Sequence, residues 1–388
     1  MKRLCVERKK LTGQYFTVNK LLQEAVFNMV KYKGEPLLEP SFGAGHLLKP
    51  FKGLSDSYPM TCYELDHEID LVVTFNEHQK VIYGDFTAQK ITERFKTIIG
   101  NPPYVARHGA KNLYIVFIEI CYGLLKKDGE LVFIVPSDFF KMTSASAIIE
   151  TMAMNGAFTD VYFPHDERLF DGASIDVVVF RYEKGCTAKR SVVNGKDMFC
   201  NVHRGIITFS ESELIGAPLS EHFDIYVGPL TGRDEVYRNA IGNIDVLSDK
   251  DRTERFIFTE TFPTANAAVN EHLLKNKEEL LSRKIKKFTE DNWFEWGAPR
   301  NIKSIQSNMG KPCIYVRSLT RSNEVAFVGT VQFFSGSLLC MIPNTGVNLT
   351  EVVAFLNSHD FQKDYRHAGR FKIGQKMLEC VRGVPAVL

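Results

Sequence analysis

The sequence predicts a doubly wound, Rossmann-like α/β domain followed by a second domain of the α+β class. Three observations support this prediction. The 388 residues exceed the length of one ordinary domain and fit two. Short apolar runs alternate with helical patterns through the first half, as in a parallel sheet covered by helices on both faces. After about Lys184 this alternation stops and a hairpin signal follows.

The strands of the first domain are predicted from short apolar or alternating runs that end at turn-forming or acidic residues. These runs are residues 36–40, 60–66, 80–86, 95–100, 130–136 and 175–180. Residues 112–125 have apolar side chains at helical spacing and are followed by Lys126, Lys127 and Gly129, which favour a helix end.

The second domain is expected to begin between residues 200 and 225. Asn194-Gly195 predicts a two-residue hairpin within residues 192–199. Beyond it the chain has short mixed elements and a charged segment, residues 270–287, that predicts a helix. We therefore assign residues 1–210 to the first domain and residues 211–388 to the second.

The composition, 44% apolar and 24% charged, is that of a soluble globular protein and excludes extensive disorder. No run approaches the roughly eighteen apolar residues that span a bilayer, and the charged amino terminus has no apolar core behind it. The eight cysteines are scattered without a Cys-x-x-Cys pair, which favours reduced thiols and no metal site. We expect a cytoplasmic protein.

The charge is unevenly distributed along the chain. Residues 272–388 hold 17 Lys and Arg against 10 Asp and Glu, a net charge of +7, whereas the whole chain carries +2. A basic carboxyl-terminal third indicates a nucleic-acid surface, with an ordinary solvated basic surface as the alternative.

The most informative segment is Asn101-Pro102-Pro103-Tyr104, directly after the strand predicted at residues 95–100. Two successive prolines lock φ twice and push the preceding residue out of the helical region, so the segment forms a rigid extended turn. Such a turn can aim the Asn101 side-chain carbonyl and the Pro102 backbone carbonyl at one exocyclic NH2 group. Tyr104 adds a flat ring on which a base can stack. A simple loop terminator is the alternative for this segment alone.

Ligand-type residues also follow the three preceding predicted strands. Glycines after the first strand let the backbone approach a ligand closely. A carboxylate after the second suits a ribose diol, and a carboxylate beside an aromatic ring after the third suits an adenine amino group. These residues are Glu39, Pro40, Gly43, Gly45, Glu64, Asp85 and Phe86. Because the carboxyl ends of parallel strands meet at one edge of a sheet, they predict a single ligand site.

The motifs TGQYFT (residues 12–17), EPSFGAG, YELD, GDF and NPPY, in this order, resemble those of amino-adenine DNA methyltransferases of the gamma arrangement. In that family the methyl-donor motifs precede the target-recognition domain. The resemblance is specific over about the first 185 residues. It is looser at residues 370–374, which resemble the close of recognition domains in restriction–modification enzymes. Val18 stands where the family often has Pro, a change of little expected consequence because proline there would only pre-set a helix start.

The resemblance implies S-adenosylmethionine as the cofactor, with Thr17 and the glycine turn beside its methionine part. It implies Glu64 at the ribose and Asp85 with Phe86 at the adenine of the cofactor. The target adenine would be held by Asn101, Pro102, Tyr104 and, on its other face, Phe170. For Thr17 a helix entry, and for Phe170 a core position, is the alternative.

The second domain is expected to contact DNA through basic and aromatic side chains, because Arg and Lys read guanine edges and hold phosphates. The DNA-binding candidates are Arg300, Arg317, Arg321, Arg370 and Lys372, with Trp293, Trp296 and Lys376 as further members of this surface. An ordinary surface charge, or a buried aromatic side chain, is the alternative for each.

The resulting hypothesis is a site-specific DNA adenine methyltransferase of a restriction–modification system, with duplex DNA and a separate cognate restriction endonuclease as partners. Only eleven residues precede Thr12, so we expect a stand-alone enzyme without a fused nuclease. One alternative is methylation of an RNA base amino group or a protein glutamine amide, because the Asn-Pro-Pro-Tyr turn also serves those reactions. Another is an inactive methyltransferase that acts as a DNA-binding specificity subunit.

Overall fold

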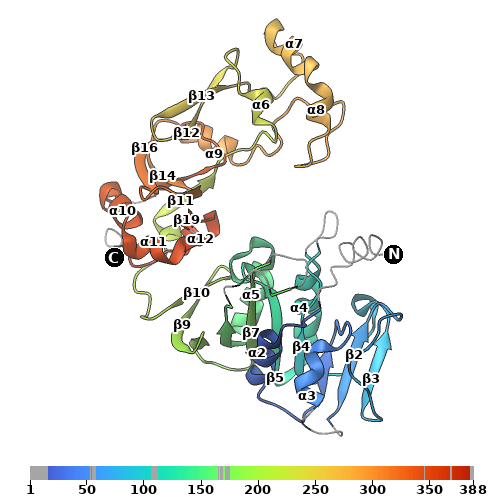
Figure 1. Cartoon of the computed structure of the whole chain (residues 1–388). Coiled ribbons are helices and arrows are strands. Elements are labelled where there is room, and N and C mark those ends of the chain that lie inside the picture. The colour runs from blue at the N-terminus through green and yellow to red at the C-terminus, as the bar shows by residue number, and fades with distance from the viewer. Residues whose placement is uncertain are drawn as a thin grey trace. The chain divides into compact units, whose positions relative to one another are not determined.

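The computed structural model describes residues 16–52, 54, 58–105, 112–164, 166, 169–170, 175–344, 346–367 and 369–384. The chain divides into two compact units, Met1–Leu214 and Ile215–Leu388 (Figure 1). The boundary expected at residue 210 lies close to this division.

The first unit is built on one ten-stranded sheet with the order β10-β9-β8-β6-β7-β5-β4-β1-β2-β3. Strands β1 to β5 pair in parallel, whereas β7 pairs antiparallel with both β5 and β6. The strands are β1 (Leu37–Glu39), β2 (Met60–Glu64), β3 (Gln79–Tyr83), β4 (Phe95–Gly100), β5 (Leu125–Pro136), β6 (Gly156–Tyr162), β7 (Val177–Lys184), β8 (Arg190–Val193), β9 (Lys196–His203) and β10 (Ile206–Ser210). All six predicted strands of this unit are confirmed, and β6 is an additional one.

Helices cover both faces of this sheet, which confirms the predicted doubly wound α/β fold. The helices are α2 (Lys20–Met29), α3 (Lys49–Lys52), α4 (Leu113–Leu124) and α5 (Ser146–Met154). Alternate strand residues point to opposite faces. On β5, for example, Phe133 packs in the cluster that contains α4 and α5, whereas Val132 packs in the cluster that contains α2 and α3.

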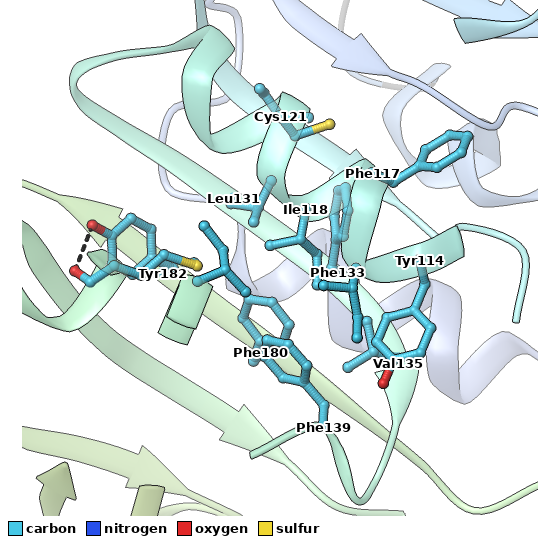
Figure 2. Close-up of a cluster of buried hydrophobic side chains, with 14 of the residues drawn as sticks. Tyr114, Phe117, Ile118, Cys121, Leu131, Phe133, Val135, Phe139, Phe180 and Tyr182 are labelled. Carbon is cyan, nitrogen blue, oxygen red and sulfur yellow. Dashed lines mark hydrogen bonds between the residues drawn. The ribbon is translucent and has the colours of Figure 1, made fainter. Parts of the chain in front are cut away.

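Aromatic side chains dominate the core on the α4 side of the sheet (Figure 2). The ring of Phe139 stacks on that of Phe180 with centroids 5.3 Å apart and planes at 11°. The hydroxyl of Tyr182 is buried but donates to the carbonyl of Met152 at 2.9 Å. Fully burying each such side chain contributes about 1.5–3 kcal/mol, so this cluster fixes α4 and β5 relative to each other.

A buried ion pair crosses the middle of the same sheet. Arg181 on β7 bonds to Glu130 on β5 at 2.6 Å, and both side chains are 0% exposed. Arg181 also bonds to Glu183 at 2.6 Å, while Glu130 accepts from the backbone N–H of Lys31 and of Tyr32. The pair therefore ties the chain after α2 to the sheet.

The predicted hairpin joins β8 to β9. Asn194 and Gly195 both have positive φ, 47° and 81°, as a two-residue type I′ turn requires. It begins an antiparallel extension, β8 to β10, in which β9 pairs with both β8 and β10.

The second unit is α+β, with its main sheet in the all-antiparallel order β11-β17-β14-β16. Its strands are β11 (Phe223–Val227), β12 (Ile244–Asp249), β13 (Arg252–Phe256), β14 (Pro312–Arg317), β15 (Leu319–Thr320), β16 (Ala326–Thr330), β17 (Leu338–Pro343), β18 (Arg366–His367) and β19 (Arg370–Lys372). Its helices are α6 (Asp234–Tyr237), α7 (Ala267–Lys275), α8 (Lys277–Leu281), α9 (Ile302–Ser307), α10 (Leu349–Leu356), α11 (His359–Gln362) and α12 (Gln375–Glu379).

The helix predicted over residues 270–287 is wrong in extent, because the chain forms the two shorter helices α7 and α8. Asn276 separates them, and its side-chain amide donates to the carbonyl of His272 at 2.8 Å. A side-chain bond to the backbone of this kind competes with helix continuation.

Within the described residues, no helix is long and apolar enough to cross a bilayer. In the same residues no group of three or more His, Cys, Asp or Glu side chains comes together to hold a metal ion.

Candidate active site

A pocket of about 890 Å³, its open mouth included, lies in the first unit at the carboxyl ends of β1 to β4. This is the edge at which doubly wound sheets bind ligands. Eight of the predicted site residues line it: Thr17, Glu39, Pro40, Gly43, Glu64, Asp85, Phe86 and Asn101. Gly45, Pro102, Tyr104 and Phe170 do not line it and lie in adjoining segments.

The turn after β1 requires glycine at two positions. Gly43 and Gly45 have φ values of 58° and 90°, in the left-handed region that favours glycine. A Cβ atom on Gly43 would lie 3.1 Å from the ring of Phe16, and one on Gly45 would lie 2.6 Å from the ring of Phe42. The turn therefore packs closely against two aromatic rings while its backbone faces the pocket.

Glu64, the last residue of β2, is held by backbone N–H groups. Its two carboxylate oxygens accept from Gly43 at 2.6 Å and from Asp66 at 2.8 Å. Each oxygen can accept a second hydrogen bond, so the carboxylate remains able to bind a hydroxyl of a ligand.

Three buried polar atoms of the pocket have no hydrogen-bond partner among the described residues: Glu39 Oε2, Ser41 Oγ and His46 Nδ1. Burial raises the pKa of the Glu39 carboxyl well above its usual range, and the nearby Glu64 raises it further. Burial, and then Lys49, lower the pKa of the His46 imidazole. Because orphaned buried polar groups cost free energy, these atoms fit a polar ligand that completes their bonding. S-adenosylmethionine has the hydroxyl, amino and carboxylate groups to do so.

Asp85 and Phe86 form the end of the pocket beyond β3. One Asp85 oxygen accepts from the backbone N–H and the hydroxyl of Thr87 at 2.9 and 2.7 Å, which orients the carboxylate. The buried Phe86 ring contacts Tyr63 edge-on and stacks on Phe117, with centroids 5.2 Å apart in both pairs. The rigid apolar surface beside a fixed acceptor suits a purine ring with an amino group.

Asn101 follows β4 and is held from two sides. Its Nδ2 donates to Thr17 Oγ1 at 3.0 Å, and its Oδ1 accepts from the hydroxyl of Tyr104 at 2.5 Å. Tyr104 also lies 3.1 Å from the carbonyl of Ile134 on β5. The amide thus has a defined orientation at the border of the pocket.

Phe170 occupies a core position in this structure. Its side chain is 3% exposed, and its ring meets that of Tyr104 edge-on at 6.5 Å and 90°. A base between the two rings requires them to be roughly parallel and further apart, so the alternative interpretation of Phe170 as a core residue describes this conformation.

The structure brings three of the predicted DNA-binding residues together in the second unit. Arg370 and Lys372 are exposed on β19, whose Phe371 is buried, and β19 pairs with β15 just before the exposed Arg321. Arg300 is exposed elsewhere in this unit, at the end of the segment before α9.

The burial and contacts of other predicted DNA-binding residues correct or weaken the predictions made for them. Trp293 and Trp296 are each 2% exposed in a hydrophobic core, so the expectation that they face DNA is wrong. Arg317 is only 12% exposed and bonds to Asp249 at 2.6 Å, a contact that favours a structural role for its guanidinium. The half-buried Lys376 lies on α12.

Sequence reasoning missed Ser41 and His46 as pocket residues. His46 directly follows the glycine turn, and its ring stacks on Phe16 at 5.9 Å. Its position after Gly45 was a usable signal. Leu113 and Phe117 also line the pocket from α4, which an apolar helix pattern does not reveal.

Within the sheet the order β3-β2-β1-β4-β5-β7-β6, with an antiparallel β7, places the pocket at the carboxyl ends of β1 to β4. Residues 63–170 match the family model described as Eco57I restriction-modification methylase. The resemblance of the motifs to methyltransferases of restriction–modification systems is thereby confirmed.

Named methyltransferases are similar to part of the chain. Type II methyltransferase M.HincII from Haemophilus influenzae is 30% identical over 201 residues, 46% of this chain and 39% of that protein. Modification methylase CviBIII from Paramecium bursaria Chlorella virus NC1A is 31% identical over 158 residues, 35% of this chain and 41% of that protein. The chain therefore spans about two fifths of the length of these relatives.

Two solved structures are similar to parts of the chain at low sequence identity. A modification subunit of a putative type I restriction enzyme from Vibrio vulnificus YJ016 is 14% identical with a TM-score of 0.41, covering 50% of this chain and 49% of that one. The type IIG restriction endonuclease BpuSI is 14% identical with a TM-score of 0.38, covering 93% and 57%.

Proposed function

We propose that this protein transfers a methyl group from S-adenosylmethionine to N6 of adenine in duplex DNA, as the modification enzyme of a restriction–modification system. One observation carries the proposal: the oriented amide of Asn101 borders a pocket that also contains Glu64 and the unpartnered Glu39, Ser41 and His46. A site for a planar NH2 group thus adjoins a site for a polar cofactor. The relatives named as type II and modification methylases support the same reaction class.

The cofactor is proposed to lie along the strand ends. Glu39 and the turn at Gly43 would contact its methionine part, Glu64 its ribose, and Asp85 with Phe86 its adenine. The cofactor supplies a methyl group on a positively charged sulfur. The aromatic rings of Phe86 and Phe117 would keep water away from the end of the pocket that they line.

The target adenine must leave the duplex, because its amino group is paired and its ring stacked there. Extrusion costs a few kcal/mol, and stacking on Tyr104 returns about 1–3 kcal/mol. Asn101 Oδ1 and the Pro102 carbonyl would accept hydrogen bonds from the amino group and draw its nitrogen towards tetrahedral geometry. This localises the lone pair and aims it at the methyl group, so that positioning and electrostatics carry the reaction.

Phe170 stays a predicted second stacking surface for this base. Its contact with Tyr104 supports the idea that the two rings can act as a pair, provided that Phe170 shifts from its core position. The proposed DNA contacts of the second unit are Arg370 and Lys372 on β19, Arg321 directly after β15, and Arg300.

The direct test is incubation of the purified protein with S-adenosylmethionine and unmethylated duplex DNA, followed by digestion to nucleosides and mass spectrometry. N6-methyladenine is the expected product. If varied DNA yields no methylated base while S-adenosylhomocysteine binds in calorimetry, the substrate assignment fails and RNA or a protein amide becomes the next substrate to assay.

A further inference from the structure

Thr17 contacts the amide of Asn101 across 84 residues of sequence. Asn101 Nδ2 lies 3.0 Å from Thr17 Oγ1, and Thr17 is 5% exposed. The motif resemblance implies only a cofactor contact for Thr17. The hydrogen bond shows that its hydroxyl also contacts Asn101, the residue proposed to bind the target amino group.

Thr17 is itself firmly held, so its hydroxyl has a fixed position. Its backbone carbonyl accepts from the side-chain amide of Gln23 on α2 at 2.7 Å, a buried bond. Asn19 caps the start of α2 by accepting from the N–H of Leu21 at 2.9 Å. On the other side, the ring of Phe16 packs over Gly43. The β-branched side chain adds its own restriction of χ1.

In the structure the Thr17 hydroxyl accepts from the Nδ2 end of the Asn101 amide, which leaves the Oδ1 end as the acceptor. The two ends of the Asn side chain differ, since Nδ2 only donates and Oδ1 only accepts hydrogen bonds. Rotation of the terminal Asn torsion by about 180° exchanges the ends, and this torsion is intrinsically broad. With Nδ2 on Thr17, the acceptor Oδ1 lies on the side of Tyr104. The opposite orientation would present NH2 to an NH2 substrate and repel it.

We infer that Thr17 is a positioning residue that orients the Asn101 amide for the target amino group. This inference rests on the proposed function and extends it from residues that touch the substrate to one that acts through Asn101. Thr17 also lines the cofactor pocket, so one residue contacts both the pocket and the amide.

Thr17→Val removes the hydroxyl but keeps the shape of the side chain, and Thr17→Ser keeps the hydroxyl. Methyl transfer at saturating cofactor is expected to fall about tenfold or more in Thr17→Val and to return to within about threefold of wild type in Thr17→Ser. The dissociation constant for S-adenosylhomocysteine, measured by calorimetry, separates this loss of turnover from a loss of the cofactor contact of Thr17.

The matched control is Thr151→Val, the same substitution on α5 and outside the pocket lining. The Thr151 hydroxyl donates to the carbonyl of Ala147 at 2.9 Å, so this variant is expected to leave both cofactor affinity and turnover unchanged. A Thr17→Val protein that loses cofactor affinity but keeps its saturated turnover overturns the inference. So does one that keeps both.

A second measurement does not depend on the substrate. In 15N-labelled protein, the side-chain NH2 resonances of Asn101, identified by their loss in Asn101→Asp, are expected to shift in Thr17→Val and to stay near wild type in Thr17→Ser. Unshifted resonances in Thr17→Val overturn the inference even if wild type methylates DNA. Shifted resonances in a protein that binds S-adenosylhomocysteine but methylates no DNA leave the positioning contact standing and overturn the proposed function instead.

Discussion

The hydroxyl of Tyr104 lies 2.5 Å from Asn101 Oδ1 and 3.1 Å from the carbonyl of Ile134, so one proton serves two acceptors. Burial, and then Tyr114, raise the pKa of the Tyr104 phenol well above its usual range, which keeps this proton in place at neutral pH. The proposed acceptor of the target amino group is therefore already hydrogen-bonded within the protein. An arriving NH2 group exchanges one donor for another, and no buried acceptor is left bare before it binds.

Two substitutions at Tyr104 test the contributions of its hydroxyl and of its ring separately. Tyr104→Phe keeps the ring, and Thr17 still holds the Nδ2 end of the Asn101 amide, so turnover on duplex DNA is expected to change less than about threefold. Tyr104→Ala loses base stacking of about 1–3 kcal/mol, so turnover divided by KM for DNA is expected to fall about five- to 150-fold. Steady-state kinetics on one methylatable duplex measures both. Equal losses in the two variants would show that the hydroxyl, and not the ring, matters.

Asn101→Ala removes one of the two proposed acceptors. Methyl transfer is expected to fall at least about a hundredfold, as on removal of one group that stabilises a transition state. Affinity for S-adenosylhomocysteine should stay within a few fold, since the strand-end residues of the cofactor pocket are unchanged. Radiolabel transfer to DNA and calorimetry give the two values. Retained turnover in this variant refutes the assignment of Asn101.

The sequence predicted those site residues that have ligand-binding side chains and stand at the end of a predicted strand. Glu39, Glu64, Asp85 and Asn101 each follow a strand of one parallel set, and the geometry of such a sheet brings them to one edge. That His46 Nδ1 is buried without a hydrogen-bond partner depends on tertiary packing, which residue order does not encode. The same limit explains Trp293 and Trp296, because a tryptophan in a basic region fits a core or a DNA surface equally well before packing is known.

For the sheet, too, local patterns predicted individual elements, but they did not predict how the elements pair. Local patterns predicted β1 to β5 and the turn at Asn194-Gly195, which needs only positive φ at two adjacent residues. The antiparallel insertion of β7 between β5 and β6 was not predicted, since an apolar run carries no strand direction.

The buried pair of Arg181 and Glu130 makes a prediction about stability. Arg181→Met leaves the Glu130 carboxylate buried without its cation and is expected to lower the free energy of unfolding by about 3–5 kcal/mol. The exposed pair of Arg190 and Asp197 is the control, and Arg190→Ala should cost less than about 1 kcal/mol. Urea unfolding, followed by far-UV circular dichroism, gives the free energy of unfolding of each variant. Equal midpoints in the two variants would contradict the expectation.

The second unit is tested by the salt dependence of DNA binding. Arg370 is exposed on β19. Arg370→Ala is expected to weaken DNA binding. It is also expected to reduce the slope of the logarithm of the binding constant against the logarithm of the salt concentration by about 0.9, the contribution of one phosphate contact. Arg252→Ala, at an exposed arginine paired with Glu254 in the same unit, is the control and should leave the slope unchanged. Fluorescence anisotropy with a labelled duplex measures both. A slope unchanged by Arg370→Ala argues against a phosphate contact at this residue.

Glu39 predicts how the stability of the cofactor-free protein depends on pH. Burial, and then Glu64, raise the pKa of its carboxyl well above the usual range, so the folded state holds this proton more tightly than the unfolded state does. Its contribution to stability is therefore fully present below the unfolded pKa of about 4.3 and is lost as pH rises through the raised folded pKa. Glu39→Gln keeps the shape of the side chain but removes the titrating carboxyl group. Its melting temperature, measured without cofactor, should match wild type at about pH 4 and exceed it as the pH rises from there. Glu35→Gln, at an exposed position of the same unit, is the control. A constant difference between Glu39→Gln and wild type across this range would show that the Glu39 carboxyl does not titrate with folding.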